Sequence, residues 1–252
     1  MKAIPSRWFV IFLVFFFLMG IAENIAAIHE RMEAAAKRAG RSLSDITLMG
    51  VTKTHPPDRI REGYVAGLRV FGENRVQEFA SKAGAVADLP EAEWHMIGHL
   101  QTNKAAKSVE LFSGVDSVDS EKLAERLNAA AVKLGKKVSV LIEINVGGEA
   151  AKSGVAADSG ELEDLLSSAG RFEALDFSGL MTVPPFTEDA EEARPFFRRL
   201  REMRDEIASR RLGGIRMDVL SMGMSHDFEV AIAEGSTCVR VGTAIFGRRE
   251  KA

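Results

Sequence analysis

The chain has 252 residues and a formal net charge of −3, with 46% apolar and 27% charged residues. These are the values of an ordinary globular protein that is long enough to bury a large core, and nothing in them indicates disorder or a disulfide-stabilised scaffold. The slight negative charge offers no broad cationic surface to nucleic acid or to anionic lipid, so any bound anion has to be held by a local site. The only cysteine, Cys238, excludes an internal disulfide, and its apolar neighbours favour a buried core position.

The N-terminal residues differ from the rest of the chain. Residues 8–22 form an unbroken apolar run of 15 residues, which is short for a membrane span of about 20 residues and is typical of a signal peptide. We favour a third interpretation, in which translation starts at Met19, because the elements of a complete domain follow directly. We therefore divide the chain into an apolar extension, 1–18, and one domain, 19–252.

The first half of that domain alternates between helix and strand. Ile21, Ile25, Ile28 and Met32 recur at helical spacing and predict an amphipathic helix over 21–38. Apolar runs predict strands, and caps or prolines mark where helices begin. On these signals the strands are expected at 46–52, 68–71, 94–97 and 111–118, and the helices at 57–66, 75–87, 102–108 and 121–134.

The second half continues the alternation and fixes the fold class. Its strands are expected at 138–146, 177–183, 217–222 and 238–245, and its helices at 161–169, 188–210 and 228–233. Eight strands alternating with helices predict an α/β fold, a (β/α)8 TIM-type barrel with an extra N-terminal helix. The alternative is an open doubly wound sheet, which more often carries a GxGxxG turn after its first strand; this sequence has none.

Barrel enzymes place their functional groups at the C-terminal ends of the strands. The polar stretches at those ends are Lys53, Asn74, His99, Asn145, Met181-Thr182, Ser221 to Ser225 and Arg240 to Thr243. A lysine at the end of an apolar strand loses hydration, which lowers its pKa and frees the neutral amine to attack a carbonyl. The alternative is a lysine that extends out of the barrel into water.

The last two strands indicate a phosphate site. Gly223 and Ser225 follow the seventh strand, and Gly242 and Thr243 lie at the end of the eighth, where barrels commonly bind phosphate through backbone N–H groups and hydroxyls. The alternative is that these glycines only bend tight loops. Arg240 lies between two valines, so its guanidinium needs an acceptor, for which a salt bridge at the barrel rim is the simplest candidate.

Five stretches together resemble the signatures of the pyridoxal-phosphate homeostasis family. They are VTKTHP at 51–56, FGENRVQE at 71–78, WHMIGHLQTNK at 94–104, SMGMS at 221–225 and VRVGTAIFG at 239–247. The resemblance covers about residues 19–250; it departs from the common pattern at His226, where an acidic residue is frequent. It implies the barrel of alanine racemase without that enzyme's second domain.

The resemblance also implies a cofactor and its contacts. Lys53 would hold pyridoxal 5′-phosphate as a Schiff base, and Ser225, Gly242 and Thr243 would bind the phosphate. Asn74 and Met181 would lie near the ring, and Arg240 would face the pyridine nitrogen. These seven residues are assigned to cofactor binding. We assign no metal-binding residue and no catalytic residue.

Two functions of different classes follow, and a third uses the same groups. The first is a cytoplasmic, non-catalytic carrier that takes part in pyridoxal phosphate homeostasis and delivers the cofactor through transient contacts with apoenzymes, without nucleic acid or stable membrane association. The second is a pyridoxal-phosphate-dependent amino-acid racemase, which needs a proton acceptor on each face of its substrate, whereas the only tyrosine, Tyr64, falls in the first barrel helix. The third, a Schiff-base aldolase, lacks a clear acid or base beside the lysine.

Overall fold

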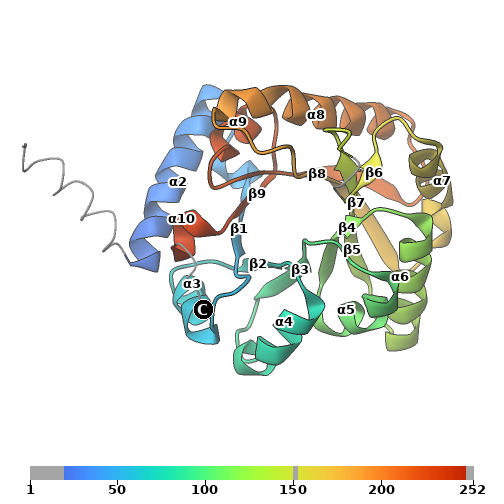
Figure 1. Ribbon diagram of the computed structural model, residues 1–252, viewed down its shortest axis with the longest axis horizontal. Coiled ribbons are helices and arrows are strands. Elements are labelled where there is room, and N and C mark those ends of the chain that lie inside the picture. The colour runs from blue at the N-terminus through green and yellow to red at the C-terminus, as the bar shows by residue number, and fades with distance from the viewer. Residues whose placement is uncertain (1–19, 150–152, 248–252) are drawn as a thin grey trace, which may run out of the picture.

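The computed structural model describes residues 20–149 and 153–247, which form a closed ring of parallel strands surrounded by helices (Figure 1). Strand β4 pairs with β5, and β9 pairs with β1, so the ring has no open edge. The predicted (β/α)8 barrel is confirmed, and the open doubly wound sheet is excluded. A two-residue strand, β6 (Val155–Ala156), pairs with the end of β5 outside the ring. In order around the ring, the strands are β1 (Thr47–Val51), β2 (Val70–Glu73), β3 (Glu93–Met96), β4 (Gly114–Val118), β5 (Val138–Asn145), β7 (Leu175–Met181), β8 (Ile215–Met224) and β9 (Cys238–Val241).

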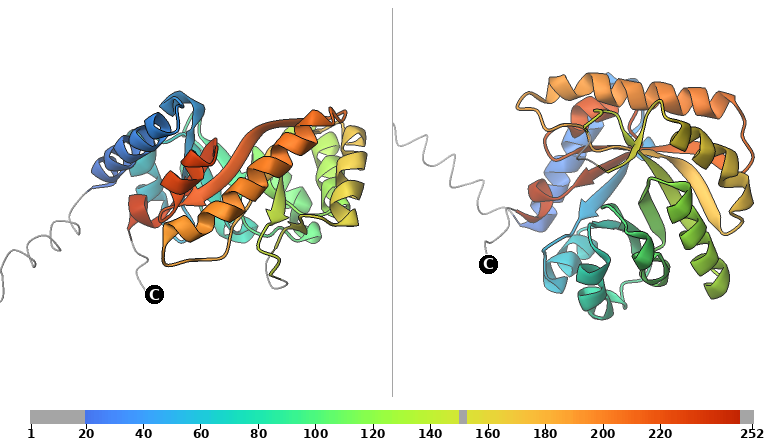
Figure 2. Two further views of the ribbon diagram at one scale, coloured as in Figure 1. Left: turned by 90° about the horizontal axis from the view of Figure 1, so that it is seen from above. Right: turned by 45° about the vertical axis from the view of Figure 1, so that its right-hand side comes forward.

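Helices cover the outside of the ring, as Figure 2 shows from two further directions. The predicted N-terminal helix is confirmed, with Ile21, Ile25, Ile28 and Met32 all buried. The Asn24 amide donates to the Ile245 carbonyl at 2.9 Å and ties this helix to the last one. In chain order the helices are α2 (Ile21–Arg38), α3 (Pro57–Val65), α4 (Val76–Lys82), α5 (Ala105–Leu111), α6 (Glu121–Leu134), α7 (Gly160–Ser168), α8 (Arg194–Ser209), α9 (Phe228–Ala233) and α10 (Thr243–Phe246).

The end of the chain corrects one predicted strand. The sequence predicts a strand over 238–245, but β9 ends at Val241 and the next residues form the helical turn α10. The amides of Ile245 and Phe246 both donate to the Gly242 carbonyl, which closes that turn. The error has a physical cause, because a short apolar run looks the same whether it is a buried strand or a buried turn of helix.

Two predicted helices each contain a 3₁₀ turn at one end. The predicted helix 188–210 begins with a 3₁₀ turn, Ala190–Ala193, and only then becomes α8. The predicted helix 75–87 is α4 followed by a 3₁₀ turn, Ala83–Val86. The helix predicted over 121–134 is confirmed as α6, and Ser120 caps it, since its hydroxyl accepts a hydrogen bond from the Leu123 amide. Local signals therefore locate elements better than they locate the exact geometry of their ends.

No helix within 20–149 or 153–247 is both long and apolar enough to span a bilayer. The predicted extension, 1–18, lies outside the described residues. Its proposed separation from the domain therefore stays a prediction.

The interior of the barrel is polar at its N-terminal end. A cavity of about 410 Å³ there is lined by His95, Asp116, Ser139 and Ser178, among other residues. His95 Nδ1 lies 2.8 Å from Asp116 Oδ1, and Asp116 is buried. Burial by itself lowers the pKa of His95, but the Asp116 carboxylate, helped by Glu93, outweighs burial and raises that pKa to about 10. His95 is therefore a cation at neutral pH.

We expect Asp116→Asn to destabilise the protein by up to about 3–5 kcal/mol, the typical loss when one member of a buried ion pair is removed. The folded-state pKa of His95 lies above its ordinary value of 6.5, so the pair stabilises fully below pH 6.5 and loses its contribution as pH rises through about 10. Urea unfolding across that pH range should show this decline in the wild type and a flatter profile in the variant. Parallel profiles would mean that the pair does not set the pH dependence.

Candidate functional site

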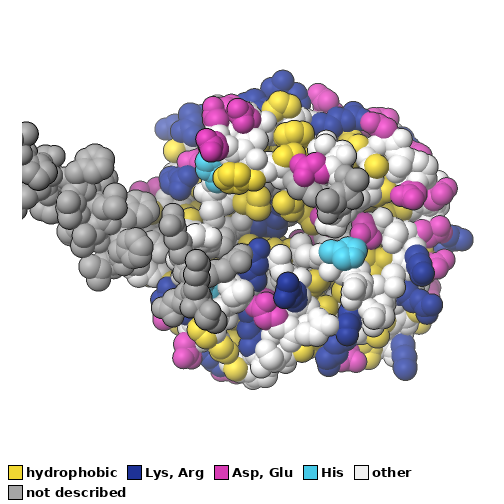
Figure 3. Space-filling view, viewed as in Figure 1, with side chains coloured by type: hydrophobic (Ala, Val, Ile, Leu, Met, Phe, Trp, Pro, Cys, Tyr) yellow, Lys and Arg dark blue, Asp and Glu magenta, His cyan; other side chains and the backbone are white. Residues whose placement is uncertain are grey.

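The C-terminal ends of the strands meet at one face of the barrel, called the mouth here. Figure 3 views the molecule from this side and shows a depression near the centre of the ring, with apolar and basic side chains at its edge. All seven residues predicted to form the site lie at the C-terminal ends of strands or in the segments that follow them: Lys53, Asn74, Met181, Ser225, Arg240, Gly242 and Thr243, the last of which begins α10.

Arg240 lies inside the barrel and is held by neutral acceptors. One guanidinium nitrogen donates to the Ser221 hydroxyl and another to the Thr182 carbonyl, each at 2.7 Å. Its side chain is buried, and burial lowers the pKa of Arg240 from its ordinary value, although nearby carboxylates oppose this effect. The simple expectation of a salt bridge at the rim is not met, because these two bonds fix the guanidinium within the strands. Met181 pairs with Ser221 in the register of β7 and β8, so it lies in the same layer.

The loops after β8 and β9 come together as predicted for a phosphate site. The Ser225 hydroxyl accepts a hydrogen bond from the Ala244 amide at 3.4 Å, which joins the two loops. A side chain at position 242 would come within 3.3 Å of the Val51 carbonyl, so glycine allows the last loop to lie against the end of β1. Thr243 is exposed and Ser225 is half-buried.

Lys53 and Asn74 follow neighbouring strands. β1 pairs with β2, and the Thr52 amide donates to the Gly72 carbonyl at 3.0 Å just before Lys53. Lys53 is half-buried, so it is less desolvated than the sequence predicts. The side-chain oxygen of Asn74 is buried without a hydrogen-bond partner among the described residues.

Sequence reasoning missed Glu143, a buried carboxyl near the end of β5. Its Oε1 accepts from the Ser153 hydroxyl at 2.9 Å, while Oε2 is buried with no partner among the described residues. Burial raises the pKa of Glu143 above its usual range. Its register partner on β7 is Met181, which places it beside the Arg240 layer. The sequence did contain a signal for Glu143, because a charged residue within the apolar strand 138–145 indicates a buried polar site. The same signal singled out Arg240.

Two other polar candidates have partners within the protein. His99 is exposed and lies 3.3 Å from Asp119, and the Asn145 amide donates to the Glu149 carbonyl. Cys238 is buried, as predicted, and burial raises the pKa of its thiol to about 12, so it stays protonated. The described residues contain no cluster of side chains suited to a metal ion.

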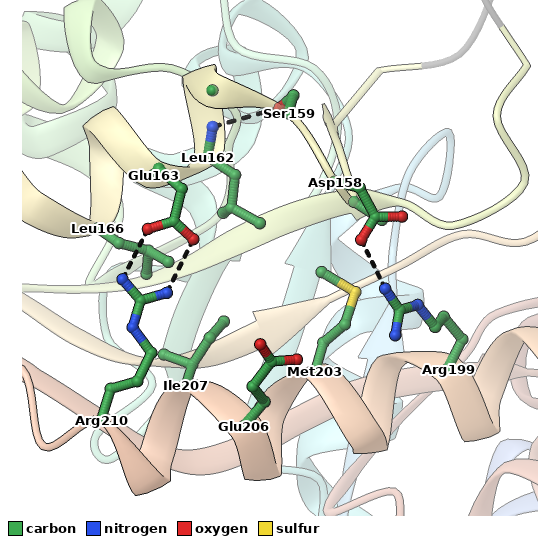
Figure 4. A pocket seen from close by; sticks show the side chains of 12 residues that line it. Asp158, Ser159, Leu162, Glu163, Leu166, Arg199, Met203, Glu206, Ile207 and Arg210 are labelled. Carbon is green, nitrogen blue, oxygen red and sulfur yellow. Dashed lines mark hydrogen bonds and ion pairs between the residues drawn. The ribbon is translucent and has the colours of Figure 1, made fainter.

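A second pocket lies outside the barrel, between α7 and α8 (Figure 4). Its cationic side chains already have carboxylate partners, with Arg199 at 2.6 Å from Asp158 and Arg210 at 2.6 Å from Glu163. The pocket is floored by apolar side chains such as Leu162 and Met203. These paired charges make it a helix-packing contact rather than an anion site.

The comparisons with known proteins identify the family. A family model described as the alanine racemase N-terminal domain matches residues 24–250. A pyridoxal phosphate homeostasis protein of Aquifex aeolicus is 46% identical over 232 residues, which covers 92% of this chain and 100% of the relative. The chain belongs to the pyridoxal phosphate homeostasis family. The family's Escherichia coli protein is 40% identical and covers 91% of this chain and 97% of the relative.

Solved structures show the same barrel. PipY of Synechococcus elongatus, with pyridoxal phosphate bound, has a TM-score of 0.77 and 37% identity, and the match covers 90% of this chain and 100% of that chain. An alanine racemase of Streptomyces coelicolor has a TM-score of 0.65 and 23% identity, and the match covers 87% of this chain and 57% of that chain. The second likeness shows a shared fold alone.

The mouth fits the cofactor that the family is named for. A phosphorylated aldehyde needs an amine, donors for its phosphate, and polar groups around its ring. The mouth contains the Lys53 amine, which would react with the aldehyde. It also contains the Ser225 and Gly242-Thr243 loops, whose hydroxyls and N–H groups would be donors to the phosphate. Oxygens on Asn74 and Glu143 are buried without partners among the described residues, as is expected of groups that complete their hydrogen bonds with a ligand.

Proposed function

We propose that this protein binds pyridoxal 5′-phosphate at the barrel mouth through Lys53 and supplies it to apoenzymes, as a carrier in vitamin B6 homeostasis. The observation that carries the proposal is the joining of two phosphate-type loops beside β1, the strand that leads into Lys53. Membership of the homeostasis family and the cofactor in PipY support it. When bound, the cofactor supplies an aldehyde that condenses with the Lys53 amine to a Schiff base and releases water.

The chain's own residues would divide the binding between them. The Ser225 hydroxyl and the loop at Gly242-Thr243 would hold the phosphate, since hydroxyls and backbone N–H groups are its usual donors. Arg240 would present a fixed guanidinium to the ring, oriented by Ser221 and Thr182. Asn74 and Met181 would border the ring from β2 and β7.

The carrier is favoured over the racemase by the location of the tyrosine. Tyr64 lies in α3 on the outside of the barrel, where its hydroxyl donates to the Pro90 carbonyl at 2.7 Å. It therefore does not supply the second proton acceptor that racemisation needs. Arg240, if it faces the ring nitrogen, opposes protonation there and weakens the ring as an electron sink. Both features favour holding the cofactor over turning over a substrate.

The test of the proposal is a spectrum of the purified protein, followed by borohydride reduction and peptide mapping. A protein that holds the cofactor should be yellow, and reduction should fix the label on the peptide that contains Lys53. A colourless protein that gains no colour from added cofactor would exclude the proposal and would favour the aldolase. Transfer to an apoenzyme is tested separately below.

We further propose that 19–252 carries this function in the cytoplasm and that the extension 1–18 is dispensable. A chain that starts at Met19 should bind the cofactor as tightly as the full chain, because every described element lies downstream of residue 19. Cofactor titrations of both chains, followed by absorbance, measure this. A shortened chain that fails to fold would mean that the extension packs against the barrel.

A further inference from the structure

The turn that carries Lys53 has an unfavourable backbone conformation. Thr54 has a φ of +65°, in the left-handed region that β-branched residues rarely adopt. The His55 amide donates to the Thr52 carbonyl at 3.1 Å and closes the turn around Lys53. Such a conformation costs free energy and persists only where the surrounding structure holds it.

Three side chains from one neighbouring segment hold this turn. The Lys82 ammonium donates to the Thr52 carbonyl at 2.9 Å and to the His55 carbonyl at 3.4 Å. Glu78 Oε1 accepts from the Thr54 amide at 2.5 Å. Glu73 Oε1 accepts from the Thr52 hydroxyl. Side chains of α4 therefore hold the backbone on both sides of Lys53, and Glu73 of β2 holds the Thr52 side chain beside it.

The same three side chains form a largely buried ionic cluster. Lys82 Nζ lies 2.8 Å from Glu73 Oε1 and 3.2 Å from Glu78 Oε1, and both Lys82 and Glu73 are buried. Burial raises the pKa of Glu73, which Lys82 partly offsets, and Glu73 Oε2 has no partner among the described residues. Buried ion pairs gain little stability because desolvation offsets their attraction. Stability alone is therefore a weak explanation for this cluster.

We infer that Glu73, Glu78 and Lys82, called the clasp here, are positioning residues for the Lys53 amine. The clasp fixes the backbone before and after Lys53, so the direction of its amine is set before the aldehyde arrives. Misplacement of a reacting group by about 1 Å can lower a rate by roughly 100-fold. The inference rests on the proposed function, in which Lys53 is the residue that bonds the cofactor.

The test uses a variant that removes the closest pair of charges together. Lys82→Met/Glu73→Gln removes the two buried charges together and leaves only the partly exposed Glu78 without its ionic partner, so the Tm should stay near that of the wild type. Two rates are measured: hydrogen exchange of the Thr54 amide without cofactor, and the appearance of borohydride-fixed label on Lys53 after pyridoxal 5′-phosphate is added. We expect exchange to be at least about tenfold faster and labelling about 10–100-fold slower at saturating cofactor, with the half-saturating concentration unchanged.

Two further variants make the result decisive. Lys107→Met removes an exposed lysine that pairs with Glu110 on α5, and it should behave as the wild type. Glu78→Ala removes the acceptor of the Thr54 amide from a partly exposed helix position and should repeat both rate changes even if the double variant fails to fold. If a folded clasp variant exchanges the Thr54 amide and labels Lys53 at the same rates as the wild type, the inference is wrong. If the label in the wild-type protein maps to another lysine, both the assignment of Lys53 and the inference about the clasp are wrong. If it maps to Lys53 in the wild type, the assignment stands, and the variants then test the clasp alone.

Discussion

Lys53→Ala is expected to purify without colour and to take no borohydride-fixed label from added pyridoxal 5′-phosphate. The loop after β9 lies against the end of β1, where the Gly242 backbone approaches the Val51 carbonyl, and a hydrogen bond joins it to the loop after β8. A cofactor whose phosphate is bound by these loops, as proposed, would lie near the residue two positions beyond Val51. Another lysine would have to replace Lys53 without any movement of the phosphate, so covalent binding should be lost.

Lys104→Ala is the matched control for this variant. Lys104 is a half-buried lysine that lines a pocket beside Asn74 and His99, and it is an alternative amine within the sequence motifs. The control should keep both colour and label. If Lys53→Ala stays yellow and its label maps to Lys104, the covalent site has been assigned to the wrong strand end.

The loaded protein is expected to transfer its cofactor to an apoenzyme while racemising alanine or serine slowly or not at all. General acid–base groups typically contribute about 10²–10⁴-fold each, and the tyrosine that would be the second one faces away from the barrel interior. Recovery of apoenzyme activity measures transfer, and loss of optical rotation measures racemisation. A protein with the proposed function should succeed in the first assay and fail in the second.

A turnover number in the usual enzyme range, on the order of 1–10³ s⁻¹, for any free amino acid would contradict the carrier. The structure names the residue to examine in that event. Glu143 is a buried carboxyl with a raised pKa on β5, the strand opposite β1 in the ring. Glu143→Gln would abolish such turnover if Glu143 were the second acid, and would leave transfer intact.

The sequence alone was sufficient for the order of elements and for most of the candidate site. Apolar runs separated by amphipathic helices located all eight barrel strands. The polar residues at or just after their C-terminal ends included Lys53, Asn74, Ser225 and Arg240. The reason is that burial on both faces of a parallel strand leaves a readable apolar run, and a polar residue at its end interrupts that run. The eighth strand was predicted to be too long, because the apolar run that marks it continues through α10.

Only the tertiary structure decided which polar groups inside the barrel meet. Hydrophobic periodicity shows that a residue is buried, but it does not show whether the residue faces the helices or the interior of the ring. The pairing of β9 with β8 and of β8 with β7 brings Arg240 to Thr182, and closure of the ring puts Glu143 on β5, the strand opposite β1. The hydrogen bond from the Lys82 ammonium to the Thr52 carbonyl likewise joins residues about 30 positions apart. Such a contact exists only once the strands have paired.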